Sequence, residues 1–230
     1  MDTAAHYRHE LKYEISYAQY LPLRQRLRSV MTPDDHAGAD GRYRIRSVYF
    51  DNINDKALRE KVDGVSRREK FRIRYYNDDL SYITLEKKIK DRNLCLKYDA
   101  PLTRQQYEEL VNGETAWMKD HPSPVVRELY AKMHYELLRP RVLVSYLREP
   151  YVYRAGNVRV TFDSDIRTSL YHQKFAQETI PDICAADTPQ TMILEVKYDN
   201  FLPDVIAHLI QMDGVRQQAF SKYAVCRRFG

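Results

Sequence analysis

The sequence predicts an α+β fold in which about eight antiparallel strands close into a β-barrel and amphipathic helices pack against the outside of the barrel. Three observations lead to this prediction. Many segments alternate apolar and polar side chains with the period of a strand. Other segments place apolar side chains at helical spacing, and the polar strand faces carry many more cations than carboxylates. With 230 residues and 43% hydrophobic content, residues 1–230 are expected to form a single domain.

Strict alternation recurs along the chain and is typical of strands with two different faces. In Arg8–Ile15, for example, Glu10 and Lys12 alternate with Leu11 and Tyr13. Six strong segments and two weaker ones show the pattern, and Lys87 is the one charged residue on an apolar face. In chain order the predicted strands are Arg8–Ile15, Tyr43–Asp51, Glu69–Tyr76, Tyr82–Lys90, Asn93–Asp99, Arg141–Tyr151, Val158–Asp163 and Leu194–Tyr198.

Helical segments lie between the strands and carry recognisable end signals. Thr103–Gln106 has the composition of a capping box. Ser123–Pro124 places an N-cap residue before a proline at the first helical position. Pro203 also begins a helix. Pro22 is expected in the first turn of the helix that carries Leu23–Val30, because proline has no N–H for an interior hydrogen bond.

The charged strand faces allow two interpretations. They are either the solvated side of an ordinary sheet or the lining of a closed barrel. Helices with apolar stripes need apolar strand faces to cover, which favours an interior position for the charged faces. The cations on these faces are Lys12, Arg46, Arg72, Arg74, Lys88, Lys90, Lys97, Arg148, Arg159 and Lys197, and the acids are Glu10, Glu86, Asp163 and Glu195.

Cations crowded inside a barrel repel one another strongly unless a polyanion lies among them. A chain of phosphates meets this requirement, because arginine forks match phosphate oxygens and lysines add point charges along the path. The few carboxylates are then explained as ligands of a divalent cation, Mn²⁺ or Mg²⁺, that bridges the phosphates.

Six motifs occur in a defined order along the chain. They are Glu10–Tyr13, Ser47–Asp51, Lys70–Tyr76, Leu85–Lys88, Leu194–Tyr198 and Ser221–Tyr223. Together they resemble a bacterial VTC domain, the polyphosphate polymerase branch of the CYTH-like triphosphate tunnel metalloenzymes, over Arg8–Arg227. The resemblance implies the triphosphate-tunnel fold and a phosphotransferase reaction in which the terminal phosphoryl of ATP is added to a growing polyphosphate chain.

The resemblance also implies roles for individual residues. The positions expected to act in catalysis are Arg72, Arg74, Lys88, Lys197 and Lys222. Those expected to bind substrate are Lys12, Lys97, Arg148, Arg159 and Ser221, to which the strand pattern adds Arg46 and Lys90. Glu195, with Glu10, is expected to bind the metal. Eukaryotic members tend to have a histidine where this chain has Lys90.

Other features limit the function classes. The expected partners are ATP and inorganic polyphosphate or pyrophosphate, and the cysteines and histidines have no context that predicts a protein nucleophile. No established nucleic-acid motif is present. The three scattered cysteines and the lack of an apolar signal core predict a cytoplasmic protein. No window predicts a membrane span, although a membrane partner protein is possible because eukaryotic relatives are coupled to membrane segments.

Two further functions stay open at this point. A triphosphatase of the same fold would transfer the phosphoryl group to water, but such hydrolases carry a Glu-x-Glu-x-Lys strand, and Arg8 occupies the first acidic place in Arg8–Lys12. A module that only binds polyphosphate or another polyanion is the second alternative. The 19 tyrosines also permit stacking on single-stranded nucleic acid, although most fall on apolar faces where core packing explains them.

Overall fold

A closed ring of antiparallel strands forms the centre of the molecule. The computed structural model describes residues 7–92, 94–169, 182–185 and 191–228. The strand order is β7-β3-β4-β5-β6-β1-β10-β8, and β8 pairs back onto β7 to close the ring. The eight strands are β1 (Arg8–Ile15), β3 (Tyr43–Asp51), β4 (Arg67–Tyr76), β5 (Asp79–Asp91), β6 (Leu94–Leu102), β7 (Arg139–Tyr153), β8 (Val158–Ser169) and β10 (Met192–Tyr198). The predicted barrel is confirmed.

Two short strands extend this sheet: β2 (Thr32–Pro33) pairs with β7, and β9 (Ile183–Cys184) pairs with β8. The predicted strand bounds agree with the structure to within a few residues at most ends, and β8 continues six residues beyond its predicted end at Asp163. Asn93, the first residue of one predicted strand, lies outside the described residues. The alternation of side chains therefore located every strand of the ring.

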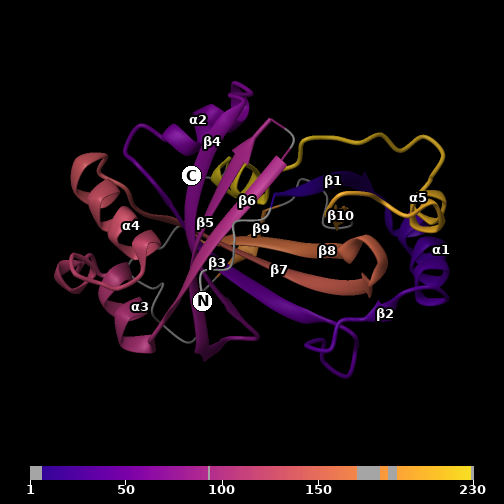
Figure 1. Cartoon of the computed structure of the whole chain (residues 1–230), viewed down its shortest axis with the longest axis horizontal. Coiled ribbons are helices and arrows are strands. Elements are labelled where there is room, and N and C mark those ends of the chain that lie inside the picture. The colour runs from indigo at the N-terminus through magenta and orange to yellow at the C-terminus, as the bar shows by residue number, and fades with distance from the viewer. Residues whose placement is uncertain (1–6, 93, 170–181, 186–190, 229–230) are drawn as a thin grey trace.

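The helices lie outside or at the end of this ring (Figure 1). They are α1 (Tyr17–Arg28), α2 (Lys56–Val62), α3 (Arg104–Val111), α4 (Pro124–Tyr135), α5 (Asp204–Leu209) and α6 (Lys222–Arg227), and short 3-10 turns span Ala116–Met118 and Ala155–Asn157. The predicted capping box of α3 is present. The prediction for Pro22 is wrong: α1 begins at Tyr17 behind a Ser16–Gln19 capping box, so Pro22 lies inside the helix and leaves one interior backbone hydrogen bond unmade.

Apolar layers cover the outer faces of the strands on two sides of the ring, where Figure 1 shows α3 and α4 on one side and α1 and α5 on the other. In the first layer Tyr107 and Leu129 pack with Phe71 and Leu85 of β4 and β5. In the second layer Leu23 of α1 packs with outward side chains of β8 and β10. Because alternate strand residues are committed to these layers, the charged residues between them must face the interior.

Two local features modify the alternation. Asp165 adopts a positive φ of 48° at a register shift between β7 and β8, so Asp163 and Ile166 both face the interior despite their odd spacing. Lys87 stays on the outer face, where its Nζ contacts the carboxylates of Glu69 and Glu128. The charged residue on an apolar strand face is therefore explained by an outer ion pair.

One part of the interior is apolar and is closed by α6. Tyr223 and Cys226 of this helix pack against Val144 and Tyr146 of β7. The Tyr223 hydroxyl donates to Asp51, whose carboxylate also accepts hydrogen bonds from backbone N–H groups at the start of α2. Buried Asp51 thus holds α2 and α6 at the same end of the ring.

The pairing of β1 with β6 is the shortest contact between neighbouring strands of the ring. Only Arg8 and His9 of β1 pair with β6. Further along β1, the backbone N–H of Gln218 donates to the carbonyl of Lys12 over 2.9 Å, and Gln217 bridges to Tyr13. The segment before α6 therefore takes the place of a neighbouring strand. We call the region formed by β1, the start of β6 and Gln217–Gln218 the seam.

Candidate functional site

The interior faces of the strands, together with the start of α6, bring cations from distant parts of the chain to a common space. The cations are Lys12, Arg68, Lys70, Arg72, Arg74, Lys88, Lys90, Lys97, Arg148, Arg159, Lys197 and Lys222. The interior carboxylates are Glu10, Glu86, Asp99, Asp163 and Glu195. On β4, for example, Phe71 and Ile73 between the cations are in an outer apolar layer. The cations outnumber the carboxylates.

Two neighbouring carboxylates, Glu10 of β1 and Glu195 of β10, lie at the centre of this space. The Lys12 amine lies 3.4 Å from an oxygen of each. The Lys197 amine lies 3.0 Å from Glu195 and 3.7 Å from Glu10. Lys88 reaches across from β5 to contact both oxygens of Glu10, at 2.8 and 2.9 Å. Three lysines from three strands therefore share one pair of carboxylates.

A third carboxylate, Asp163 of β8, is fully buried beside this pair. Arg148 binds it with two parallel hydrogen bonds of 2.7 Å, and the Lys222 amine of α6 contacts it at 2.5 Å. Arg148 also lies 3.3 Å from Glu195. Bidentate pairing fixes the direction of the guanidinium, so Asp163 holds Arg148 beside Glu195 and also contacts Lys222.

A fourth carboxylate, Glu86 of β5, contacts cations of the two neighbouring strands. Arg72 contacts it at 2.6 Å, Lys97 at 3.5 Å and Arg74 at 3.8 Å. Arg74 also donates to the hydroxyls of Ser47 and Tyr146 over 3.3 Å. The guanidinium of Arg148 lies over the ring of the same Tyr146. Tyr146 therefore contacts both the group around Glu86 and the group around Asp163.

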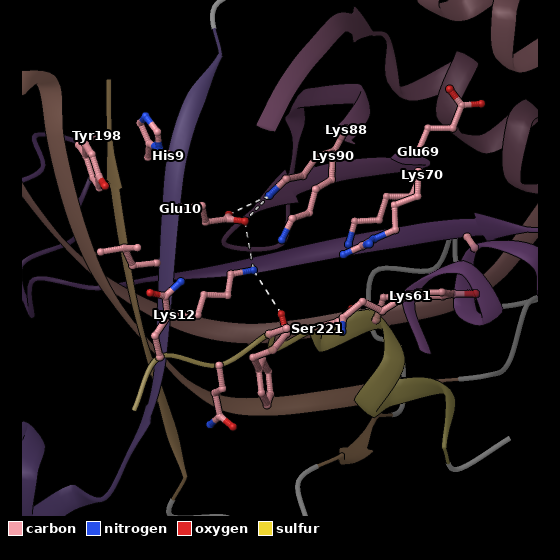
Figure 2. A pocket seen from close by; sticks show the side chains of 18 residues that line it. His9, Glu10, Lys12, Lys61, Glu69, Lys70, Lys88, Lys90, Tyr198 and Ser221 are labelled. Carbon is pink, nitrogen blue, oxygen red and sulfur yellow. Dashed lines mark hydrogen bonds and ion pairs between the residues drawn. The ribbon is translucent and has the colours of Figure 1, made fainter. Parts of the chain in front are cut away.

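The interior opens into a cavity of about 440 Å³ at the seam. Figure 2 shows the amines of Lys12, Lys88 and Lys90 pointing into it from the strands and that of Lys61 entering from α2. Ser221, the N-cap residue of α6, lies on its wall. The carbonyl of neighbouring Phe220 accepts a hydrogen bond from Lys12 over 3.3 Å. The cavity therefore connects Glu10, one of the two central carboxylates, with the outside.

The electrostatics of the site hold the carboxylates in their charged form. Burial raises the pKa of Glu10, but the charges of Lys12 and Lys88 outweigh burial and lower this pKa to about 2. Glu195 behaves similarly: burial opposes ionisation, but Lys197 and Lys12 hold its pKa well below the usual range. At neutral pH both carboxylates are ionised and available to a cation.

For two interior lysines, burial outweighs the opposing charges of neighbouring groups and lowers the pKa of the amine. Burial, together with the charges of Lys88 and Arg72, lowers the pKa of Lys70 to about 8, although Tyr49 acts against this shift. Burial also lowers the pKa of Lys197 to about 8 despite its carboxylate neighbours. Tyr49 therefore does not offset the effect of burial on the pKa of Lys70, and Glu195 and Glu10 do not offset it for Lys197.

Most of the residues predicted for this site are brought together, and two are not. Arg46 was expected in the interior but lies on the outer face of β3 between Ile45 and Ser47, and its Nε contacts Asp78 at 2.6 Å. Both faces of β3 carry polar residues, so alternation alone could not orient it. Arg159 faces inward at the far end of β8, where it contacts the Tyr43 hydroxyl at 2.7 Å and Asp34 at 2.8 Å.

Five residues of the site were not predicted: Tyr49, Lys61, Arg68, Lys70 and Asp99. Arg68 and Asp99 lie opposite Lys90 and Glu86 in the strand register. Lys70 has the same strand parity as Arg72 and Arg74, and this signal was available in the sequence. Tyr49 accepts a hydrogen bond from Arg72 over 2.8 Å, but in sequence it reads as an ordinary core tyrosine. Lys61 lies on α2, a helix of seven residues without a predictable apolar stripe.

The donor set at the centre fits a hard divalent cation. Glu10 and Glu195 present carboxylate oxygens to the same space, and Mg²⁺ or Mn²⁺ typically uses one or two protein carboxylates with phosphate oxygens as further ligands. Among the residues that the structure describes, no three His, Cys, Asp or Glu side chains form a metal-binding group. A cation held here would therefore depend on oxygens of the substrate.

The chain is similar to known proteins in sequence pattern and in fold. A family model described as the VTC domain matches residues 7–229. No curated protein matches the chain. Within the described part of the chain, no helix combines the length and apolar character needed to cross a membrane.

Solved structures that are similar to this chain have low sequence identity to it. A candidate adenylate cyclase of Bacillus halodurans is 15% identical with a TM-score of 0.51, and the alignment covers 85% of this chain and 82% of that one. A Pyrococcus horikoshii protein is 12% identical with a TM-score of 0.48, covering 97% and 99%. The Mimivirus capping enzyme triphosphatase is 11% identical with a TM-score of 0.37, covering 90% and 86%. At this identity, the similarity to the Bacillus halodurans protein shows the fold alone.

The lowered pKa of Lys70 leads to a prediction about proton uptake. At about pH 9 this lysine is mostly neutral, and a bound polyphosphate should restore its charge. Binding of long-chain polyphosphate by the wild type should then take up about one proton more than binding by Lys70→Gln. Isothermal titration calorimetry in two buffers of different ionisation enthalpy measures this difference.

The charged and titratable groups that act on Lys70 are Tyr49, Arg72, Lys88 and Lys12. The comparison between wild type and variant cancels protons exchanged by the ligand itself. Equal proton uptake by both proteins would show that no phosphate approaches Lys70.

Proposed function

Because the chain belongs to the VTC domain family, we propose that it is a polyphosphate polymerase that transfers the terminal phosphoryl group of ATP to a growing inorganic polyphosphate chain. One observation carries this proposal: cations from strands far apart in sequence converge on an interior in which carboxylates are too few to neutralise them. A linear chain of phosphates supplies the missing negative charge over the whole length of such a space.

In the proposed reaction the bond between the β–γ bridging oxygen and the γ-phosphorus of ATP breaks, and a terminal oxygen of the acceptor chain bonds to that phosphorus. The products are ADP and a chain longer by one phosphate. Arg72 and Arg74 are held by Glu86, and Arg148 and Lys222 by Asp163. These fixed cations can stabilise negative charge on the transferring group without reorganising.

Glu10 and Glu195 would hold the divalent cation. When bound, such a cation supplies positive charge to phosphate oxygens and helps to align them. The proposal requires no protein nucleophile or strong base, because the terminal oxygen of the acceptor is already ionised near neutral pH. Lys12, Lys88 and Lys197, which now contact the two carboxylates, would bind phosphates of the chain.

The proposal also gives a role to the other residues that the sequence predicts to bind substrate. Lys97 lines the path beside Glu86, Lys90 and Ser221 line the cavity, and Arg159 would contact phosphate only at the far end of the interior. ATP and polyphosphate or pyrophosphate are the proposed substrates, and we propose that residues 1–230 work as one cytoplasmic domain, with a membrane protein as a possible partner.

Incubation of the purified protein with ATP and Mn²⁺, followed by sizing of the products, tests the proposal. We expect long polyphosphate together with ADP. Glu195→Gln should reduce polymer formation by about 100-fold or more, because it removes one of the two charges proposed to hold the metal. Glu114→Gln, at an exposed position just after α3, serves as the control and should leave the rate unchanged.

The products also separate the alternatives. Orthophosphate without polymer would identify a tri- or polyphosphatase, and ATP left intact would identify a module that only binds polyphosphate. Full activity of the Glu195 variant would remove this residue from the metal site.

Two arginines on neighbouring strands give a matched test of the interior face. Arg74 is buried inside the ring, whereas Arg46 faces outward toward Asp78. Arg74→Ala should weaken ATP binding by about 10- to 100-fold, the effect of losing a hydrogen bond to a charged group. Arg46→Ala should leave ATP affinity nearly unchanged. Equilibrium binding with a fluorescent ATP analogue measures both, and equal effects of the two variants would contradict the proposed substrate path.

A further inference from the structure

Four cations at the opening of the cavity form a group that differs from those deeper in the ring. Lys61 comes from α2, Arg68 and Lys70 from β4, and Lys90 from β5. All four line the cavity at the seam. Figure 2 shows the side chains of Lys61, Lys70 and Lys90 reaching toward the same space from two sides. We call these four residues the mouth cluster.

The mouth cluster has no carboxylate partner. Among the described residues, no Asp or Glu oxygen lies within 4.0 Å of a side-chain nitrogen of these four residues. Glu69 also lines the cavity, but its oxygens contact Lys87 at 2.9 Å and Lys132 at 2.5 Å on the outer side. The deeper cations Lys12, Lys88 and Lys197 all contact carboxylates. Within the described part of the chain, the cations of the mouth cluster are therefore not in direct ion pairs with carboxylates.

Strand register makes this arrangement unfavourable without a ligand. Arg68 lies directly opposite Lys90, and Lys70 lies directly opposite Lys88. Like charges in directly opposed positions destabilise a sheet. Burial and the charges of Arg68 and Lys90 lower the pKa of Lys61, which agrees with this repulsion. An anion between the side chains would remove the penalty.

The position of the mouth cluster shows which part of a ligand it could contact. Lys12, Lys88 and Glu10 line the same cavity and also belong to the central group. The cavity thus continues from the central carboxylates past the mouth cluster, beside the short β1–β6 pairing. A triphosphate bound at the centre would leave Lys61 and Arg68 free, whereas a longer chain would extend past them.

We propose that the mouth cluster is a second phosphate subsite that binds the part of a linear polyphosphate extending out of the ring, so that the protein prefers long chains to ATP or tripolyphosphate. This inference rests on the proposed function, because it assumes that a phosphate chain occupies the interior. It assigns Lys61 and Arg68 a role in selecting chain length that the deeper cations do not share.

Binding of tripolyphosphate and of long-chain polyphosphate, measured without ATP, tests the subsite. The double variant Lys61→Gln/Arg68→Gln should lose about 10-fold in affinity for long chains, as expected for two charge-assisted contacts, and should change less than about twofold for tripolyphosphate. The salt dependence of long-chain binding should also become weaker. Lys90→Gln, which leaves the contact of Arg68 with the Val65 carbonyl in place, should show the same selective loss.

Arg26→Gln/Arg28→Gln on exposed α1 removes the same charge far from the cavity and should not change either affinity. The inference is overturned if the mouth variants bind long chains as tightly as the wild type, or if they lose both ligands equally. Wild-type protein that binds neither ligand would overturn the proposed function itself. Wild-type protein that binds both with equal affinity per chain would overturn only the subsite.

Discussion

Repulsion between cations inside a closed ring is the constraint on which the rest of the structure depends. Lys88 lies opposite both Lys70 and Lys97 in the strand register, so like charges face one another across three adjacent strands. Glu10, Glu86, Asp163 and Glu195 compensate part of this charge and fix the direction of the nearest cations. The remaining repulsion must be offset by apolar packing elsewhere.

The fold provides that packing on three sides. Helices α3 and α4 cover one outer face, α1 and α5 cover another, and α6 fills part of the interior. The strands of this architecture follow from the sequence, because apolar outer faces require the period of two that the sequence displays. The short helices α2 and α6 do not follow from it. At seven and six residues they are too short to show a clear helical period, and both are tied to Asp51 by hydrogen bonds.

The site was predictable to the extent that strand parity was clear. On β4, apolar Phe71 and Ile73 separate the cations, so the inward direction of Arg72 follows directly. On β3, Arg46 stands in a stretch with polar residues on both faces, and only the pairing with β4 shows that Ser47 faces inward. The position of Lys61 in the cavity depends on where α2 packs against the ring, and no local sequence pattern predicts that packing. The inner carboxylates were visible in the sequence, but their assignment to particular cations required the register.

The most direct test of this account is the effect of a polyanion on stability. The free energy of unfolding should be measured by urea titration with tripolyphosphate and with NaCl at the same ionic strength. At about one hundred times its Kd, tripolyphosphate should raise the free energy of unfolding by about 2.7 kcal/mol above the NaCl value. Equal values in the two salts would contradict an interior that binds phosphate chains.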